Sequence, residues 1–323
     1  MRVAILGAGG IGGYFGGLLA RAGHSVFVLA RGENLSVLRQ RGLEARTPEE
    51  TFLVPVKASD DVRQFDPVDL AIVVVKTYSL AEVAPAAQWL AQSGALILPL
   101  LNGVDIADRL MERGVPKENV LGGLTTISAE RTSPGIFERH GKVHQIVFGE
   151  FEPAPVANAH VPARSERVEE VGEVFRGAGV ETRVSGDIRL DLWRKFAFLA
   201  PVAAACGLTR SPIGPIRAIP LGRLLLERAI AEVVAVARAR GITLADNEVS
   251  RIMELCDSLP GTNKPSLLRD LEAGRPTEIE DLSGAVSRTG RSLVIETPIH
   301  DTAFAAISLA PQNTPDHSKA HNP

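Results

Sequence analysis

The sequence predicts an α/β protein, with a doubly wound parallel sheet in its first part and a second, all-helical domain in its C-terminal part. Short apolar runs alternate with helical patterns early in the chain, and the run 70–75 is apolar throughout, as in a strand covered on both faces. Strand patterns nearly vanish after Arg189. The 323 residues are enough for two domains, predicted at residues 1–186 and 187–311 with a flexible tail at 312–323.

The alternation in the first domain predicts parallel strands joined by helical crossovers, because such βαβ units are the usual right-handed connection. Short apolar runs predict strands at residues 2–6, 25–30, 70–75 and 95–100. Apolar spacing near 3.6 residues predicts helices at 12–22, 35–40 and 79–91. Residues 43–56 carry charges and are expected to form an antiparallel excursion or a loop.

The region 120–185 changes character but keeps strand patterns. We predict strands at 120–129, 143–148 and 180–184, a helix at 164–178, and an exposed Pro/Ala-rich loop at 153–162. We assign this region to a continuation of the same sheet.

Apolar residues recur at helical spacing through the second domain. The predicted helices are 192–205, 221–239, 246–258, 266–272, 279–289 and 297–307. Cys206 and Cys256 lie in these apolar patterns and are expected to be buried small hydrophobic residues. Two cysteines are too few for a disulfide framework, so the composition fits the reducing cytoplasm.

Composition and charge exclude several classes of function. The net charge of −3 gives no reason to expect nucleic acid or an anionic membrane as a partner. No window approaches the ~20 apolar residues of a membrane span, and the N-terminal apolar run reads as a strand rather than a signal peptide. The seven histidines show no metal-ligand spacing, so no metal is expected. His300 is expected to be structural, and His140 to lie on a turn.

A glycine-rich loop connects the first strand to the first helix and matches the pattern G-x-G-x-x-G. The first glycine permits a tight turn, the second lets the backbone approach a pyrophosphate, and the third lets helix and strand pack closely. The helix N-terminus offers free N–H groups to phosphate. This context predicts a Rossmann-like domain, and the expected cofactor-binding residues are Gly7, Ala8, Gly9, Gly10, Ile11 and Gly12.

The end of the second strand indicates which nicotinamide cofactor is used. Folds specific for NAD usually place an acid there for the ribose 2′-hydroxyl, whereas this chain has Arg31. A guanidinium suits a 2′-phosphate, so NADP(H) is favoured over NAD(H). Two alternatives stay open: Glu33 as a displaced ribose acceptor, and Arg31 as a solvated surface charge.

Two further polar residues follow predicted strands at the edge where ligands bind in open α/β sheets. Lys76 ends the buried run 70–75 and is a candidate for contact with cofactor phosphate or adenine, unless it simply emerges into solvent. Asn102 can donate and accept hydrogen bonds at once, which suits contact with both a nicotinamide ribose and a substrate carbonyl. Its alternative role is Asn-Gly turn chemistry.

Lys195 stands beside Trp193 at the start of an apolar helical pattern. In a chain with a redox cofactor it is a candidate proton donor, because an alkoxide formed at a carbonyl needs a proton. Partial burial would lower its pKa towards the working range. The alternative, an exposed lysine at a helix start, is the commoner fate of lysines.

With these features the chain resembles the ketopantoate reductase (2-dehydropantoate 2-reductase) family over almost its full length. The residues that carry the resemblance are the glycine loop, Val75-Lys76, Leu101-Asn102-Gly103, Leu192-Trp193-Arg194-Lys195, and the segments 264–271 and 274–279. The resemblance implies reduction of a 2-oxo acid to a 2-hydroxy acid by NADPH in a protein with a Rossmann domain and a helical domain.

The resemblance also implies roles for single residues. The catalytic lysine of the family falls on Lys195, its acidic partner on Glu278, and its strand-end asparagine on Asn102. The substrate-side serine and asparagine fall on Ser266 and Asn263, and the cofactor arginine on Arg31. For three of these positions a structural role stays open: a first-turn helix charge for Glu278, a helix cap for Ser266 and turn chemistry for Asn263.

The chain departs from the family pattern on the helix of Lys195. Two family asparagines, implied to hold substrate oxygens, are replaced by Leu199 and Ala203, which leaves a more apolar wall to the substrate site. The substrate could still be ketopantoate, as in pantothenate biosynthesis, with other residues replacing the asparagines. A third hypothesis is an NADP(H)-binding regulator without turnover. The sequence does not give the oligomeric state, and a homodimer is compatible with it.

Overall fold

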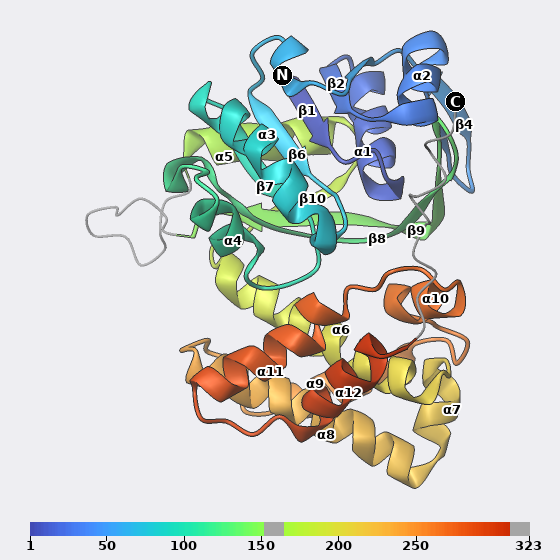
Figure 1. Ribbon diagram of the computed structural model, residues 1–323, viewed down its shortest axis with the longest axis vertical. Helices are drawn as coiled ribbons and strands as arrows, with labels where there is room; N and C mark the ends of the chain where they lie inside the picture. Colours follow the sequence, from blue (N-terminus) through green and yellow to red (C-terminus); the bar gives the residue numbers. More distant parts are fainter. Residues whose placement is uncertain (152–164, 311–323) are drawn as a thin grey trace, which may run out of the picture. The chain divides into compact units, whose positions relative to one another are not determined.

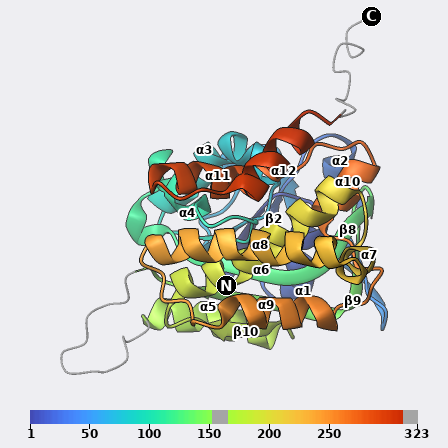
Figure 2. The same ribbon diagram turned by 90° about the horizontal axis from the view of Figure 1, so that it is seen from below.

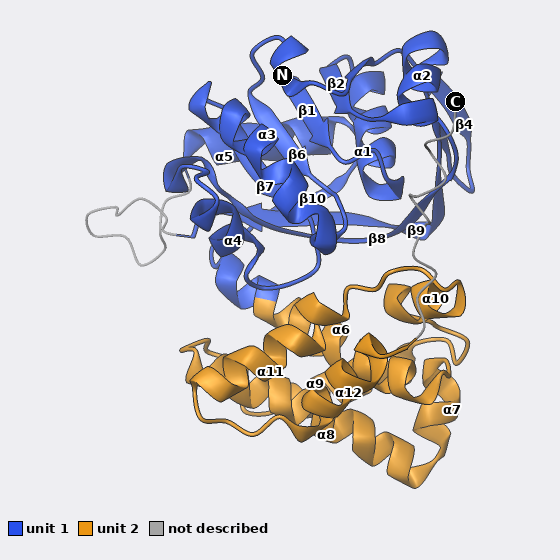
Figure 3. Cartoon of the chain, viewed as in Figure 1, with its two compact units in different colours: residues 1–192 blue, residues 193–323 orange. Residues whose placement is uncertain are grey.

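The computed structural model describes residues 1–151 and 165–310, and the predicted loop at 153–162 and the predicted tail at 312–323 lie outside them. The chain divides into two compact units, Met1–Leu192 and Trp193–Pro323 (Figure 3). The division falls inside the long helix α6 (Ile188–Thr209), which starts two residues after the predicted boundary at residue 186.

The first sheet of unit 1 is parallel throughout, with strand order β5-β2-β1-β6-β7. Figure 1 labels four of these strands, β1, β2, β6 and β7. The strands of this sheet are β1 (Arg2–Leu6), β2 (Ser25–Leu29), β5 (Lys57–Ser59), β6 (Leu70–Val73) and β7 (Leu96–Pro99). Helices α1 (Gly10–Arg21), α2 (Gly32–Arg41) and α3 (Leu80–Gln92) connect them. This confirms the predicted fold class for the first domain. The three-residue strand β5 was too short to be predicted.

Apart from an isolated parallel bridge between Val120 and Ile97 of β7, the region 120–185 is not a continuation of that sheet, so this prediction is wrong. It forms a second sheet of order β10-β9-β3-β4, with β8 paired to β9. The strands are β3 (Leu43–Arg46), β4 (Thr51–Val54), β8 (Gly122–Ser133), β9 (Ile136–Gly149) and β10 (Glu181–Val184). The strands of the first sheet are buried, as β6 and β7 are throughout, because helices cover both faces of a parallel sheet. Most of β8 after its first four residues is exposed or half-buried, so it does not suit that sheet.

The segment 43–56 is the antiparallel pair β3–β4, as predicted. His140 lies within β9, so the prediction that it lies on a turn is wrong. The reason is a pairing irregularity in the β8–β9 ladder, where Gly141 has a φ of 71° and locally distorts a strand that continues beyond it.

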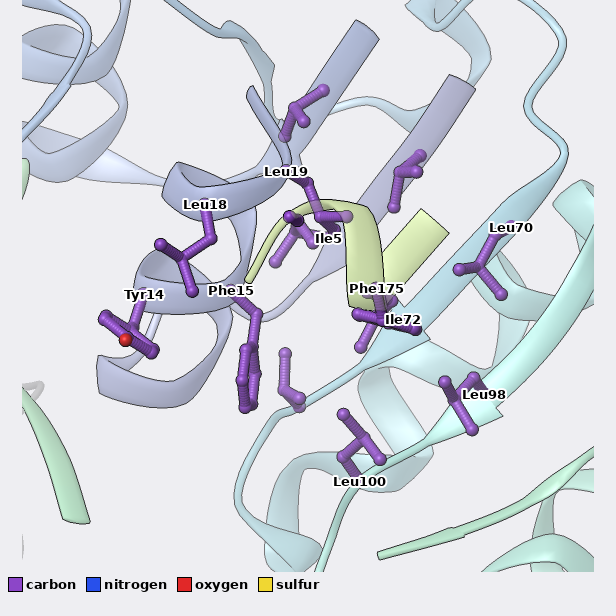
Figure 4. Close-up of a cluster of buried hydrophobic side chains, with 14 of the residues drawn as sticks. Ile5, Tyr14, Phe15, Leu18, Leu19, Leu70, Ile72, Leu98, Leu100 and Phe175 are labelled. Atoms are coloured by element: carbon purple, nitrogen blue, oxygen red, sulfur yellow. The ribbon is translucent and has the colours of Figure 1, made fainter. Parts of the chain in front are cut away.

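Helix α1 packs against both sheets of unit 1, and glycines make this close packing feasible. A Cβ built on Gly13 would lie 2.1 Å from the Phe137 ring of β9, and one on Gly12 would lie 2.9 Å from the Ile5 side chain of β1. The larger residues of α1, among them Phe15 and Leu19, fill the core beside the first sheet (Figure 4). Helix α1 is thus a layer shared by two sheets.

Unit 2 contains helices but no strand within its described residues 193–310, as predicted for the second domain. Its helices after α6 are α7 (Ile213–Ala218), α8 (Pro220–Ala239), α9 (Glu248–Ser258), α10 (Ser266–Glu272), α11 (Ser283–Ser292) and α12 (Pro298–Ser308). Helix α8, seen along its length in Figure 2, packs against α9, α11 and α12. The helix predicted at 279–289 is interrupted: a 3-10 turn η4 (Ile279–Asp281) precedes α11, and Leu282 between them has a ψ of −95°.

Shorter elements complete the described chain. In unit 1 these are α4 (Ile106–Glu112), α5 (Glu166–Gly177) and the 3-10 turns η1 (Val62–Gln64), η2 (Thr77–Ser79) and η3 (Lys117–Asn119). The sequence predicted α5 but neither α4 nor α7. Within the described residues no helix is long and apolar enough to cross a membrane.

Candidate active site

The glycine loop of unit 1 has the geometry that a dinucleotide pyrophosphate requires. Gly7 follows β1 with a φ of 125°, and Gly12 is so close to the loop that an added Cβ would lie 2.1 Å from the Gly7 carbonyl oxygen. By contrast, a Cβ built on Gly9, the N-cap of α1, would have no atom of the described residues within 4 Å. The first turn of α1 carries no acidic residue. The loop therefore leaves space and unopposed N–H groups for a phosphate.

The carboxyl ends of the parallel strands carry the other predicted cofactor residues. Lys76 is the N-cap of η2, shortly after β6, and Asn102 follows β7 before Gly103, whose φ is 122°. Both side chains are half-buried. Because β1 pairs with β6 and β6 with β7 in parallel register, these residues and the glycine loop share one edge of the sheet. This is the edge at which Rossmann-type sheets bind their ligands.

Arg31 follows β2 at the same edge, as the N-cap of α2. Its side chain is exposed, and its Nη1 lies 3.5 Å from the Glu82 Oε2 on α3. An exposed ion pair of this length is weak, so the guanidinium can be drawn to another anion at small cost. Glu33 lies in the first turn of α2, also exposed. Both residues that the sequence offered for the ribose end of the cofactor are therefore exposed at the start of α2.

Lys195 and Glu278 of unit 2 form an acid–base pair with a perturbed lysine. Lys195 lies on α6, and burial of its amino group lowers its pKa from 10.5 to about 8, while the negative charge of Glu278 partly opposes that change. Glu278 is 6% exposed and is the N-cap of η4. The first-turn position expected for Glu278 is thus close to what is seen, and it coexists with the electrostatic contact to Lys195.

The face of α6 that carries Lys195 continues into Leu199 and Ala203, one and two turns along the helix. Leu199 is half-buried and Ala203 is fully buried. Trp193 and Phe196, at the start of the same helix, are buried in an edge-to-face ring pair with centroids 5.7 Å apart. These aromatic side chains anchor the helix turn from which Lys195 projects.

The predicted substrate-side residues lie on one short segment of unit 2. The main chain of Asn263 accepts a hydrogen bond from the Ile213 N–H and donates one to the Pro260 carbonyl, so its backbone has the predicted turn role. Ser266 is the first residue of α10, whose N-cap is Pro265, so Ser266 is not the helix cap. Both side chains are half-buried.

Sequence reasoning missed two polar residues, one beside Glu278 and one beside the glycine loop. The Thr277 hydroxyl, next to Glu278 in the chain, is buried and has no hydrogen-bond partner among the described residues. Arg131, on β8, places Nη1 3.5 Å from the carbonyl oxygen of Ala8 in the glycine loop. A Thr-Glu pair after proline was visible in the sequence as a signal, whereas nothing in it connects residue 131 with residue 8.

Other reactive side chains are structural. His300 is fully buried: its Nε2 lies 3.1 Å from the Ala229 carbonyl oxygen and must donate to it, while its Nδ1 accepts from the Ser283 hydroxyl 3.1 Å away. Burial lowers its pKa to about 4. Burial also raises the pKa of Cys206 to about 12 and of Cys256 to about 11, which makes both thiols unreactive. The described residues contain no cluster of three or more side chains that could hold a metal.

Comparisons with known proteins agree with this layout. The family model "Ketopantoate reductase PanE/ApbA" matches residues 3–153, and "Ketopantoate reductase PanE/ApbA C terminal" matches residues 187–310. The 2-dehydropantoate 2-reductase of Halobacterium salinarum is 34% identical over 313 residues, which cover 96% of this chain and 99% of the relative. The oxidoreductase YkpB of Bacillus subtilis is 30% identical over 311 residues, covering 96% and 98%.

A solved structure is equally similar. The 2-dehydropantoate 2-reductase from Geobacter metallireducens superposes with a TM-score of 0.85 at 30% identity, covering 96% of this chain and all of that chain. The similarity extends through both units, so neither unit stands outside the match.

Proposed function

The chain belongs to the ketopantoate reductase family of oxidoreductases, and from this premise we propose that it reduces a 2-oxo acid to a 2-hydroxy acid with NADPH, with Lys195 as the proton donor. The observation that carries the proposal is the pairing of Lys195 on α6 with the buried Glu278, in surroundings where burial lowers the pKa of Lys195 to about 8. A general acid is most effective when its pKa lies near the working pH. An ordinary surface lysine, with its pKa of 10.5, would be a much poorer donor.

The proposed chemistry combines hydride transfer with proton transfer. A bound nicotinamide supplies a hydride to the carbonyl carbon of the substrate. Lys195 hydrogen-bonds the carbonyl oxygen, stabilises the negative charge that develops there, and transfers its proton to that oxygen. Glu278 keeps the lysine protonated before the step, since its charge favours the ammonium form. The neutral amine then regains a proton from water.

NADPH is preferred to NADH in this proposal because of the residue after β2. Arg31 offers a planar guanidinium with only a weak, exposed partner, and this suits bidentate binding of a 2′-phosphate. Lys76 and Asn102, at the ends of β6 and β7, are proposed to contact the cofactor, and Asn102 also to contact the substrate carbonyl. The space beside Gly9, where an added Cβ would meet no atom of the described residues within 4 Å, supports the close approach of a phosphate there.

The substrate is proposed to be a 2-oxo acid with a side chain less polar than that of ketopantoate. Leu199 and Ala203 cannot hydrogen-bond a substrate hydroxyl, and a site that lacks such a partner does not favour a hydroxylated side chain. Ser266 and Asn263 are left to bind the carboxylate. Ketopantoate itself stays the second candidate, because the relative from Halobacterium salinarum is named 2-dehydropantoate 2-reductase.

The test is NADPH oxidation by the purified protein across 2-oxo acids graded by side-chain polarity, with ketopantoate included. The proposal expects turnover that is fastest with apolar side chains, and Lys195→Ala that loses turnover but binds NADPH unchanged. A preference for ketopantoate would select the second candidate. Binding of NADPH without turnover of any 2-oxo acid would instead favour the non-catalytic regulator and refute the proposal.

A further inference from the structure

The strand β8 of the second sheet lies directly against the start of α1. A Cβ built on Gly10 would lie 2.4 Å from the backbone of Ala129 and Glu130, so only glycine allows this approach. The contact joins two backbones and does not depend on any side-chain rotamer. It fixes the part of β8 that follows Ala129 beside the glycine loop.

Alternation along β8 then decides which side chain faces the loop. Residues 129, 130 and 131 pair in unbroken register with 139, 138 and 137 of β9, so Ala129 and Arg131 share one face of the strand. Phe137, the cross-strand partner of Arg131, lies on the same face and packs against Gly13 of α1, which identifies this face as the one toward the helix and its loop. Arg131 accordingly lies with its Nη1 3.5 Å from the Ala8 carbonyl oxygen.

The opposite face of β8 shows the contrast. The carboxylate of Glu130 lies 2.9 Å from the His140 Nε2 on β9, and both side chains are exposed. Arg131 has no comparable partner: within the part of the chain that the structure describes, no carboxylate lies within the 4.0 Å ion-pair distance of its guanidinium. The residue is therefore an uncompensated cation beside a loop that itself contains no basic side chain.

We infer that Arg131 binds the pyrophosphate of the dinucleotide cofactor, together with the N-terminus of α1. The inference rests on the proposed function only in that a dinucleotide is bound. The helix end supplies N–H donors and a partial positive charge, and the guanidinium supplies a full charge with two parallel N–H groups for one phosphate. In this arrangement Arg131 of the second sheet is one of the residues that bind the nucleotide at the edge of the first sheet.

The test is equilibrium binding, by calorimetry or by cofactor fluorescence, to the full chain and its variants Arg131→Ala, Arg131→Lys and the matched control Glu130→Gln. A lost charge-assisted contact weakens binding by about ten- to a hundredfold. We expect Arg131→Ala to weaken NADPH and NADH by the same factor in this range, Arg131→Lys to recover part of it, and Glu130→Gln to bind like the unchanged protein. Adenosine 2′-monophosphate, which has no pyrophosphate, should bind Arg131→Ala unchanged.

Three results separate the hypotheses. Equal affinity of Arg131→Ala and the unchanged protein for both cofactors would overturn the role of Arg131 while leaving the proposed function intact. Weaker binding of adenosine 2′-monophosphate to this variant would overturn the assignment to the pyrophosphate. If the unchanged protein bound neither NADPH nor NADH, the proposed function would fail first, and this inference with it.

Discussion

The dependence of the reaction on pH follows from the surroundings of Lys195. With a pKa of about 8, roughly 90% of this side chain is protonated at pH 7 and roughly 10% at pH 9. A proton donor must be protonated, so kcat/KM should fall about tenfold for each pH unit above 8. A lysine with its ordinary pKa of 10.5 would remain more than about 95% protonated at pH 9, and the profile would be flat there.

Glu278→Gln is the perturbation that tests this reasoning. The negative charge of Glu278 raises the pKa of Lys195 against the effect of burial. Removing that charge lowers the pKa further, so the decline in rate should begin at lower pH. The amide keeps the size and shape of the side chain, so the fold should be retained.

The assay is NADPH oxidation at saturating cofactor, with kcat/KM for the best 2-oxo acid measured from pH 6 to pH 10. Lys195→Arg provides a second check, because a guanidinium does not lose its proton in this range; it should react about 10²- to 10⁴-fold more slowly. Lys57→Ala, which alters an exposed lysine paired with Asp66, is the control. A profile flat to pH 10, or one that Glu278→Gln leaves in place, would refute the role of Lys195.

Three further predictions follow from the described contacts. Gly9→Ala should leave thermal unfolding unchanged but weaken NADPH binding at least about tenfold, because its methyl group enters only the space proposed for phosphate. Gly13→Ala should instead destabilise the protein by about 1–3 kcal/mol through overpacking. Equal melting temperatures of the two variants would contradict this prediction. Glu82→Gln should tighten NADPH binding about two- to fivefold and leave NADH binding unchanged, because it frees Arg31 for the 2′-phosphate; an equal change for both cofactors in a binding titration would place Arg31 elsewhere. The pKa of His300 falls from 6.5 to about 4 on folding, so the unfolded chain takes up a proton first as the pH drops. The free energy of unfolding should therefore decrease by up to about 3 kcal/mol between pH 6.5 and pH 4. Urea unfolding at several pH values measures this decrease, and an unchanged midpoint would show that His300 is accessible to protons in the folded state.

The parts of the fold that could be predicted from the sequence are those encoded by neighbouring residues. The strands β1, β2, β6 and β7 are continuous apolar runs, and the structure confirms them within about two residues. The second sheet could not be predicted, because its pairing joins distant segments: β3 pairs in parallel with β9, more than ninety residues later. Strand patterns in the sequence identify strands but not their partners.

The candidate site divides in the same way. The glycine loop and the strand-end residues Lys76 and Asn102 could be predicted from the sequence because each belongs to a recognisable local pattern. The structure brings them to one sheet edge. The position of Arg131 depends on how the second sheet packs on α1, which no local pattern specifies. The catalytic roles of Lys195 and Glu278 stay predictions until the variants above are measured.

The position of α1 between the two sheets limits which sequence changes this domain can accept during evolution. Gly10, Gly13 and Gly17 meet the second sheet, and Gly12 and Gly16 meet the first, so little of the helix is free to accept a larger side chain. The β8–β9 hairpin is consequently not an appendage that can be lost or replaced independently. A shortened hairpin would leave one side of α1 as bare backbone with few apolar side chains to repack. Drift in the hairpin and in the nucleotide loop should therefore be correlated, although the two segments lie more than a hundred residues apart in the chain.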